Sequence, residues 1–183
     1  MENNTKKRTE GSKDLLLVLF QNPRNASHVY SELLLKNYAK ENITIMMTKE
    51  TENQYFSGQD LTKTALGSKS IEGMGVGGIV GGAAGALAAG IAALGTSLII
   101  PGLGIIVAGA FAASLAGAGA GALAGGLVGL LVGLGISDEQ AKEFEAGIKA
   151  GGVVIGVHTK SQEDYKQLNQ HWQAFKIRED YIF

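Results

Sequence analysis

Residues 73–137 contain no Asp, Glu, Lys, Arg or His, although charged residues make up 18% of the chain. Most of the 27 glycines lie in this block, together with many alanines and aliphatic residues. The segments on either side have an ordinary polar composition, so the formal net charge of −1 hides a very uneven distribution. This pattern predicts one polar α+β domain interrupted by an apolar insert rich in glycine and alanine.

The block opens with Gly73-x-Gly75-x-x-Gly78, which has the spacing of a dinucleotide-binding loop. That loop needs a strand directly before it and an acidic residue about 20 positions later. The preceding residues, GSKSIE, make a poor strand, and no acidic residue follows before Asp138. The spacing therefore reflects the density of glycine, and it predicts no cofactor site.

Glycines in the block also recur every four residues, in two stripes. Four residues cover about 400° of an α-helix, so each stripe stays near one helix face and leaves a groove for a second helix. We therefore expect an antiparallel helical hairpin over residues 71–136. Its predicted turn residues are Pro101, Gly102 and Gly104, and its predicted helix-packing residues are Gly73, Gly77, Gly81, Gly85, Gly117, Gly121, Gly125, Gly129 and Gly133.

The environment of this hairpin has two interpretations. Glycine disfavours a helix in water by about 1 kcal/mol relative to alanine, whereas a bilayer enforces backbone hydrogen bonding. Both arms are long enough to cross a hydrocarbon core of about 30 Å. We expect a transmembrane hairpin in the cytoplasmic (inner) membrane, with membrane lipid as a partner and the polar domain in the cytoplasm. The alternative is a soluble, self-assembling regulatory or ligand-binding module whose hairpins form the oligomer core.

The polar flanks alternate strand and helix signals. Apolar or β-branched runs predict strands at 13–20, 42–49, 153–159 and 179–183. Asn22-Pro23 and two serine-led capping patterns predict helices over 23–39, 137–150 and 161–175. Two βαβ halves around one four-stranded sheet indicate a ferredoxin-like α+β sandwich. The predicted organisation is a disordered N-terminus (1–12), a linker (50–70), the hairpin (71–136) and a domain formed by 13–49 and 137–183.

Residues 99–159 resemble the bacterial general stress proteins that are induced by heat or low temperature. That family carries an I-P-G-L-G turn, a glycine- and alanine-rich run, an A-x-x-[YF]-E-x-G helix and a strand that begins with G-G. The strand-then-helix opening LLLVLFQNPRNASHVYSELL is similar to the family more loosely. The resemblance implies a stress-associated protein, and it supplies no catalytic residues. The matching positions here are Pro101, Gly102, Gly104, Ala141, Phe144, Glu145, Gly147, Gly151 and Gly152.

Candidate chemical groups are few. The chain has no cysteine, which excludes disulfides and thiolate metal sites. His28, His158 and His171 fall on a predicted helix, a strand and a second helix, and no His, Asp and Glu cluster has metal-ligand spacing. The near-zero net charge and the lack of a basic face predict no nucleic-acid partner. We therefore expect a non-enzymatic, membrane-associated general stress protein that forms a homo-oligomer, with no catalytic, cofactor or metal site and no identified small-molecule substrate.

Overall fold

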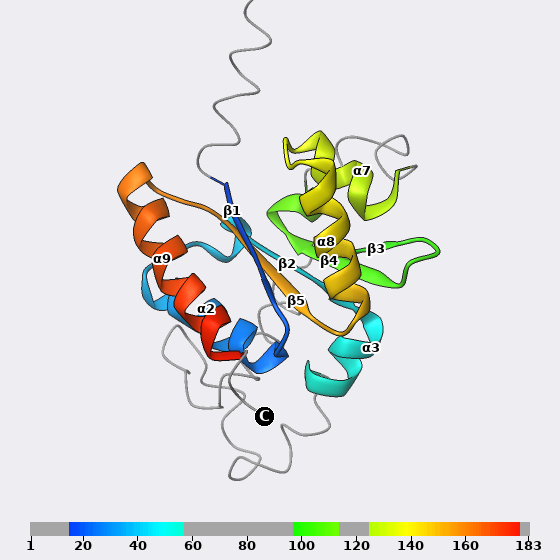
Figure 1. Ribbon diagram of the computed structural model, residues 1–183, viewed down its shortest axis with the longest axis horizontal. Helices are drawn as coiled ribbons and strands as arrows, with labels where there is room; N and C mark the ends of the chain where they lie inside the picture. Colours follow the sequence, from blue (N-terminus) through cyan, green and yellow to red (C-terminus); the bar gives the residue numbers. More distant parts are fainter. Residues whose placement is uncertain (1–14, 57–96, 114–124, 180–183) are drawn as a thin grey trace, which may run out of the picture.

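The computed structural model describes residues 15–56, 97–113 and 125–179, with side chains up to residue 173 (Figure 1). One antiparallel sheet has the strand order β1-β5-β2-β4-β3. Its strands are β1 (Leu15–Phe20), β2 (Ile43–Thr48), β3 (Ser97–Ile100), β4 (Ile105–Gly109) and β5 (Val153–His158). The longer helices are α2 (Pro23–Leu35), α7 (Gly126–Gly133), α8 (Asp138–Lys149) and α9 (Gln162–Glu179). Short helical turns are η1 (Lys40–Asn42), α3 (Lys49–Thr51) and η2 (Glu52–Phe56).

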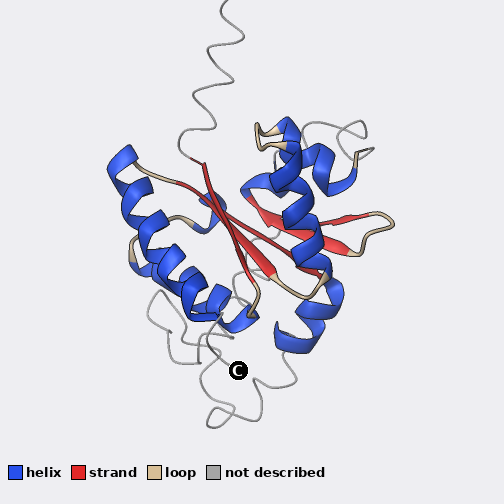
Figure 2. Ribbon diagram, viewed as in Figure 1, coloured by secondary structure: helices blue, strands red, loops and turns tan. Residues whose placement is uncertain are grey.

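Helices cover both faces of the sheet, as Figure 2 shows. Helices α2 and α9 pack on one face, and α7 and α8 pack on the other. Strand β5 lies between β1 and β2 and is antiparallel to both, so β1 and β2 run parallel to one another on either side of it. The described elements therefore form three layers, with the sheet in the middle.

Strand β1 illustrates how one short run of residues serves two cores. Leu16, Val18 and Phe20 contribute to the core under α2 and α9, while Leu15 and Leu19 contribute to the core under α8. Successive side chains of a strand point to opposite faces, and both faces of this strand are covered. That is why the sequence LLLVLF shows no alternation of apolar and polar residues.

Local signals set the helix boundaries. The Asn22 side chain accepts a hydrogen bond from the backbone N–H of Arg24 (3.0 Å), and Pro23 is the first helical residue of α2. Ser137 caps α8 by accepting from the N–H of Gln140 (3.3 Å). The helices and strands predicted at 13–49 and at 137–175 are confirmed, with ends shifted by a few residues. Residue 179 ends α9, so the strand predicted at 179–183 falls on residues outside the described part.

The predicted fold is confirmed only as an α+β arrangement with an antiparallel sheet. A four-stranded ferredoxin-like sandwich does not describe the whole sheet, which has five strands and helices on both faces. The prediction of helix on both sides of the Pro101 turn is wrong for residues 97–99 and 105–109, because these residues lie in β3 and β4. Ile99 and Ile106 pair across the hairpin, and β-branched residues favour strands.

The predicted membrane-spanning hairpin is also wrong. Among the helices of the described ranges, none is both long and apolar enough to cross a bilayer. Helix α7 is apolar but has 8 residues, which span about 12 Å against a hydrocarbon core of about 30 Å. Helix α9 has 18 residues but is polar.

Candidate functional site

The three histidines, considered as candidate acid–base groups, lie on three different elements. His28 is exposed on α2, and His158 ends β5 with its ring centroid 6.4 Å from that of Phe111. His171 lies on α9, with its Nε2 atom 3.1 Å from a carboxylate oxygen of Glu32. Within the described ranges no group of three or more His, Asp or Glu residues could hold a metal ion. The structure therefore brings none of the histidines together.

The stripe glycines fall mostly outside the described residues. Gly73, Gly77, Gly81, Gly85, Gly117 and Gly121 are not described, whereas Gly125, Gly129 and Gly133 lie at the start of α7 and within it. A Cβ atom added at Gly129 or Gly133 would meet no described atom within 4 Å, whereas one added at Gly125 would lie 2.9 Å from the Cα atom of Gly129, one turn along the same segment. Pro101, Gly102 and Gly104 lie in a tight turn, which joins β3 to β4 instead of joining two helices.

The closest contacts of described glycines with other elements are made by glycines outside the stripes, which the four-residue spacing did not indicate. A Cβ at Gly109 would lie 1.8 Å from the carbonyl oxygen of Ile43, and the φ of Gly109 is +87°. A Cβ at Gly147 of α8 would lie 2.2 Å from a methyl group of Leu19. Gly147 therefore allows α8 to lie directly on β1. Two features of the sequence could have indicated this contact. They are the apolar strand β1, which Gly147 faces, and the Gly151-Gly152 turn that follows α8.

The most unusual surface in the described part of the chain is the outer edge of β1. Strand β1 pairs with β5 along one side, and no described strand pairs with its other side. All six of its side chains are apolar. Leu17 at its centre is half-buried, while Leu15 and Leu19 are only 7% and 9% exposed. An edge strand with such buried side chains must be enclosed on both faces.

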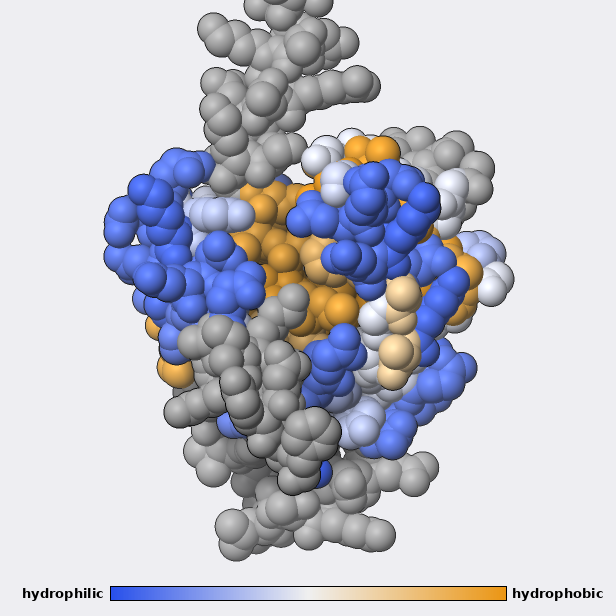
Figure 3. Space-filling view, viewed as in Figure 1, coloured by the Kyte–Doolittle hydropathy of each residue, from blue (hydrophilic) through white to orange (hydrophobic). Residues whose placement is uncertain are grey.

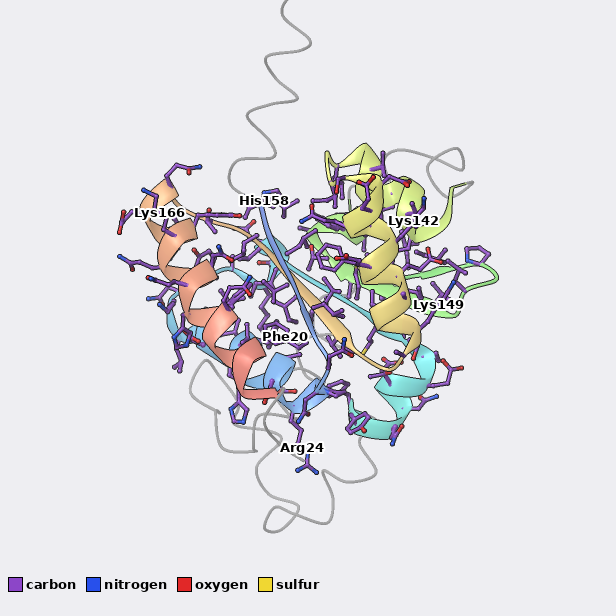
Figure 4. All side chains as sticks on the ribbon, in the orientation of Figure 1. Phe20, Arg24, Lys142, Lys149, His158 and Lys166 are labelled. Atoms are coloured by element: carbon purple, nitrogen blue, oxygen red, sulfur yellow. The ribbon has the colours of Figure 1, made fainter. Side chains whose placement is uncertain are left out.

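Helices α9 and α8 provide that enclosure. Figure 3 shows apolar surface between the hydrophilic surfaces of these two helices. On one side, the ring of Trp172 on α9 packs against Phe20 with a centroid distance of 6.1 Å. On the other side, α8 carries the ion pairs Asp138–Lys142 and Glu145–Lys149, along the helix labelled in Figure 4. We call this edge of β1, which lies between α9 and α8 and pairs with no described strand, the β1 slot.

The core under α2 and α9 holds two buried polar atoms without a hydrogen-bond partner, the hydroxyl of Tyr30 and the indole nitrogen of Trp172. Burial, with a smaller contribution from the charge of Glu41, raises the pKa of Tyr30 to about 12. Tyr38 differs, because its hydroxyl donates to the carboxylate of Asp164. The two tyrosines therefore offer a matched pair, one with an unpaired hydroxyl and one with a paired hydroxyl.

Comparison with known protein families, curated proteins and solved structures found no match. The resemblance to general stress proteins stays a prediction. The assignment of a site therefore rests on geometry, and the β1 slot is the edge of an apolar strand with which no described strand pairs.

Proposed function

We propose that this protein is a non-catalytic interaction module that binds an extended segment of a partner protein in the β1 slot. The observation that carries the proposal is that a wholly apolar strand, enclosed between α9 and α8, has one edge with which no strand in the described ranges pairs. Such an edge presents a row of backbone N–H and C=O groups that another strand can pair with. Main-chain hydrogen bonds would supply affinity, as in other proteins that bind a partner by adding a strand to a sheet.

The composition of β1 supports an edge that binds a partner strand, as opposed to an edge that is simply exposed to solvent. Native sheets protect an edge with lysine, proline, a bulge or an inward-pointing charge, and residues 15–20 contain no charge and no proline. The slot is covered from both faces, so a bound segment would need apolar side chains on both of its faces. The partner we propose is therefore an extended, uncharged segment of about six residues.

The module is proposed as non-enzymatic because its histidines lie apart on α2, β5 and α9.

We also propose that β1, β5, β2, α2 and α9 form a ferredoxin-like core, to which β3, β4, α7 and α8 are added. The order β1-β5-β2, with α2 and α9 on the same face, supports that arrangement. Membership of the general stress protein family is kept as a proposal that rests on residues 99–159.

The test is binding of a fluorescein-labelled peptide that contains six alternating valine and isoleucine residues between lysine pairs, measured by fluorescence anisotropy. A Leu17→Lys variant places a charge in the slot and should weaken binding at least tenfold, because it removes about 1.5–3 kcal/mol of apolar burial. Matched controls are Leu35→Lys and Val132→Lys, at side chains that are 66% and 43% exposed outside the slot. Equal loss in all three variants, or no binding by the native protein, would refute the proposal.

A further inference from the structure

The two faces of the β1 slot differ in how much apolar surface of β1 they leave open to a partner. On the α9 face, Leu16 and Val18 are each only 3% exposed, because they belong to the core that also contains Trp172. On the α8 face, Leu17 is half-buried and packs at the margin of the other core. The apolar surface that β1 offers to a partner is therefore concentrated around Leu17, on the α8 face.

Glycines on neighbouring elements draw the leucines of this face inward. Gly156 of β5 is paired with Leu17, and a Cβ atom built on Gly156 would lie 2.5 Å from the Cδ2 atom of Leu17. The Leu17 side chain therefore leans across the sheet over Gly156, away from the outer edge of β1. Leu19 lies in a similar way against Gly147 of α8. The part of Leu17 that stays exposed therefore borders the slot without filling it.

Helix α8 provides a second apolar contact near Leu17. Strand β5 follows α8 after a short turn and is antiparallel to β1, so α8 and β1 run in roughly the same direction (Figure 1). Residues three apart on a helix are neighbours on its surface. Phe144 therefore lies on the same side of α8 as Gly147, one turn earlier and toward Leu17. Phe144 is itself only partly buried, at the margin of the core under α8.

We infer that the β1 slot selects segments that carry one large apolar side chain, leucine or phenylalanine, on the α8 face and small apolar side chains on the α9 face. This inference rests on the proposed function, because it names the class of segment that the same site binds. The residue of an added strand opposite Leu17 has its Cβ about 4.5–5.5 Å from that of Leu17 and points to the same face. A large side chain there buries apolar surface on both partners. On the α9 face the side chains of β1 are already covered, so a large side chain has little further surface to bury.

Three fluorescein-labelled peptides test this selection by fluorescence anisotropy. Between lysine pairs they carry Val-Ala-Val-Ala-Val-Ala, the same segment with leucine at position four, or leucine at both positions three and four. The first leucine should tighten binding about tenfold, and the second, which points to the opposite face, should add less than about threefold. Equal gains from both leucines, or no gain from the first, would overturn the inference while strand binding stands. Absence of binding by all three peptides and by the valine and isoleucine peptide would refute the proposed function, and the inference with it.

Two variants of the full-length protein locate the selection at Leu17. Gly156→Ala places a Cβ where the Leu17 methyl group lies, which turns that side chain outward into the place of the large partner residue. Phe144→Ala removes the contact on α8 and adds no atom to the core, so it serves if Gly156→Ala does not fold. Each variant should reduce the gain from the first leucine to about threefold or less, with little change for the alanine peptide. The control, Leu35→Ala at a side chain that is 66% exposed outside the slot, should keep the full gain. A full gain in the slot variants as well would overturn the inference.

Discussion

Replacing Tyr30 by phenylalanine should stabilise the protein. The Tyr30 side chain is fully buried, and its hydroxyl has no hydrogen-bond partner. Leaving a buried polar group unpaired costs about 1–3 kcal/mol, because the group gives up its bonds to water on folding. Phenylalanine keeps the ring and removes the hydroxyl, so Tyr30→Phe should raise the free energy of unfolding by about 1 kcal/mol or more. For a chain of this size, each kcal/mol corresponds to about 2–4 °C in Tm.

The same substitution should change the response to alkaline pH. The pKa of Tyr30 is raised to about 12 by burial, whereas an unfolded tyrosine ionises near 10. Above pH 10 the unfolded state loses this proton first, so the native protein should lose stability as pH rises from about 10 to 12, by at most 2–3 kcal/mol. Below pH 10 the hydroxyl is neutral in both states and contributes no slope. Tyr30→Phe should lack this part of the alkaline decline.

Chemical denaturation followed by circular dichroism, at neutral pH and at pH 10–12, measures both effects. The matched control is Tyr38→Phe, which removes a hydroxyl that donates to Asp164. Hydrogen bonds to charged groups contribute about 1.5–3 kcal/mol, so this control should destabilise the protein. A Tyr30→Phe variant that is less stable than the native protein by 1 kcal/mol or more would show that the Tyr30 hydroxyl has a partner. That result would refute the reasoning.

Two further substitutions test the roles assigned to particular residues. Gly109→Ala should destabilise the protein by about 3 kcal/mol or more, because a Cβ there meets the Ile43 carbonyl and φ is positive. Its control, Gly129→Ala, fills open space in α7 and should stabilise by up to about 1 kcal/mol; destabilisation by the control would instead show that a second helix packs there. Ser137→Ala should cost about 1 kcal/mol in urea denaturation through loss of the α8 cap, and an unchanged midpoint would count against that cap.

The sequence was informative where local chemistry agrees with tertiary structure. Asn22 and Ser137 are polar caps directly before periodic apolar residues, and the helices begin where these caps predict. The apolar run within 13–20 predicted a strand, and the structure has β1 there with side chains in both cores. In these segments, propensity, capping and burial pattern lead to the same element.

The helical prediction is wrong around Pro101, where it rests on glycine spacing and the β-branched side chains favour strands. Spacing of four residues arises readily in a segment this rich in glycine, whereas the isoleucines on either side of Pro101 carry a real preference for strands. The β1 slot could not be predicted either, because an unpaired edge depends on the order of strands across the sheet. That order results from contacts between residues far apart in the chain.

The place of β5 in the sheet has a consequence for how the protein is made. Strand β5 lies between β1 and β2, although it is synthesised long after both. At 5–20 residues per second, the ribosome needs roughly 5 to 20 s to add the approximately 110 residues from Thr48 to His158. During that interval the apolar faces of β1 and β2 have no central strand to join them. Nascent chains of this protein should therefore depend on chaperones that shield apolar segments until translation passes residue 158.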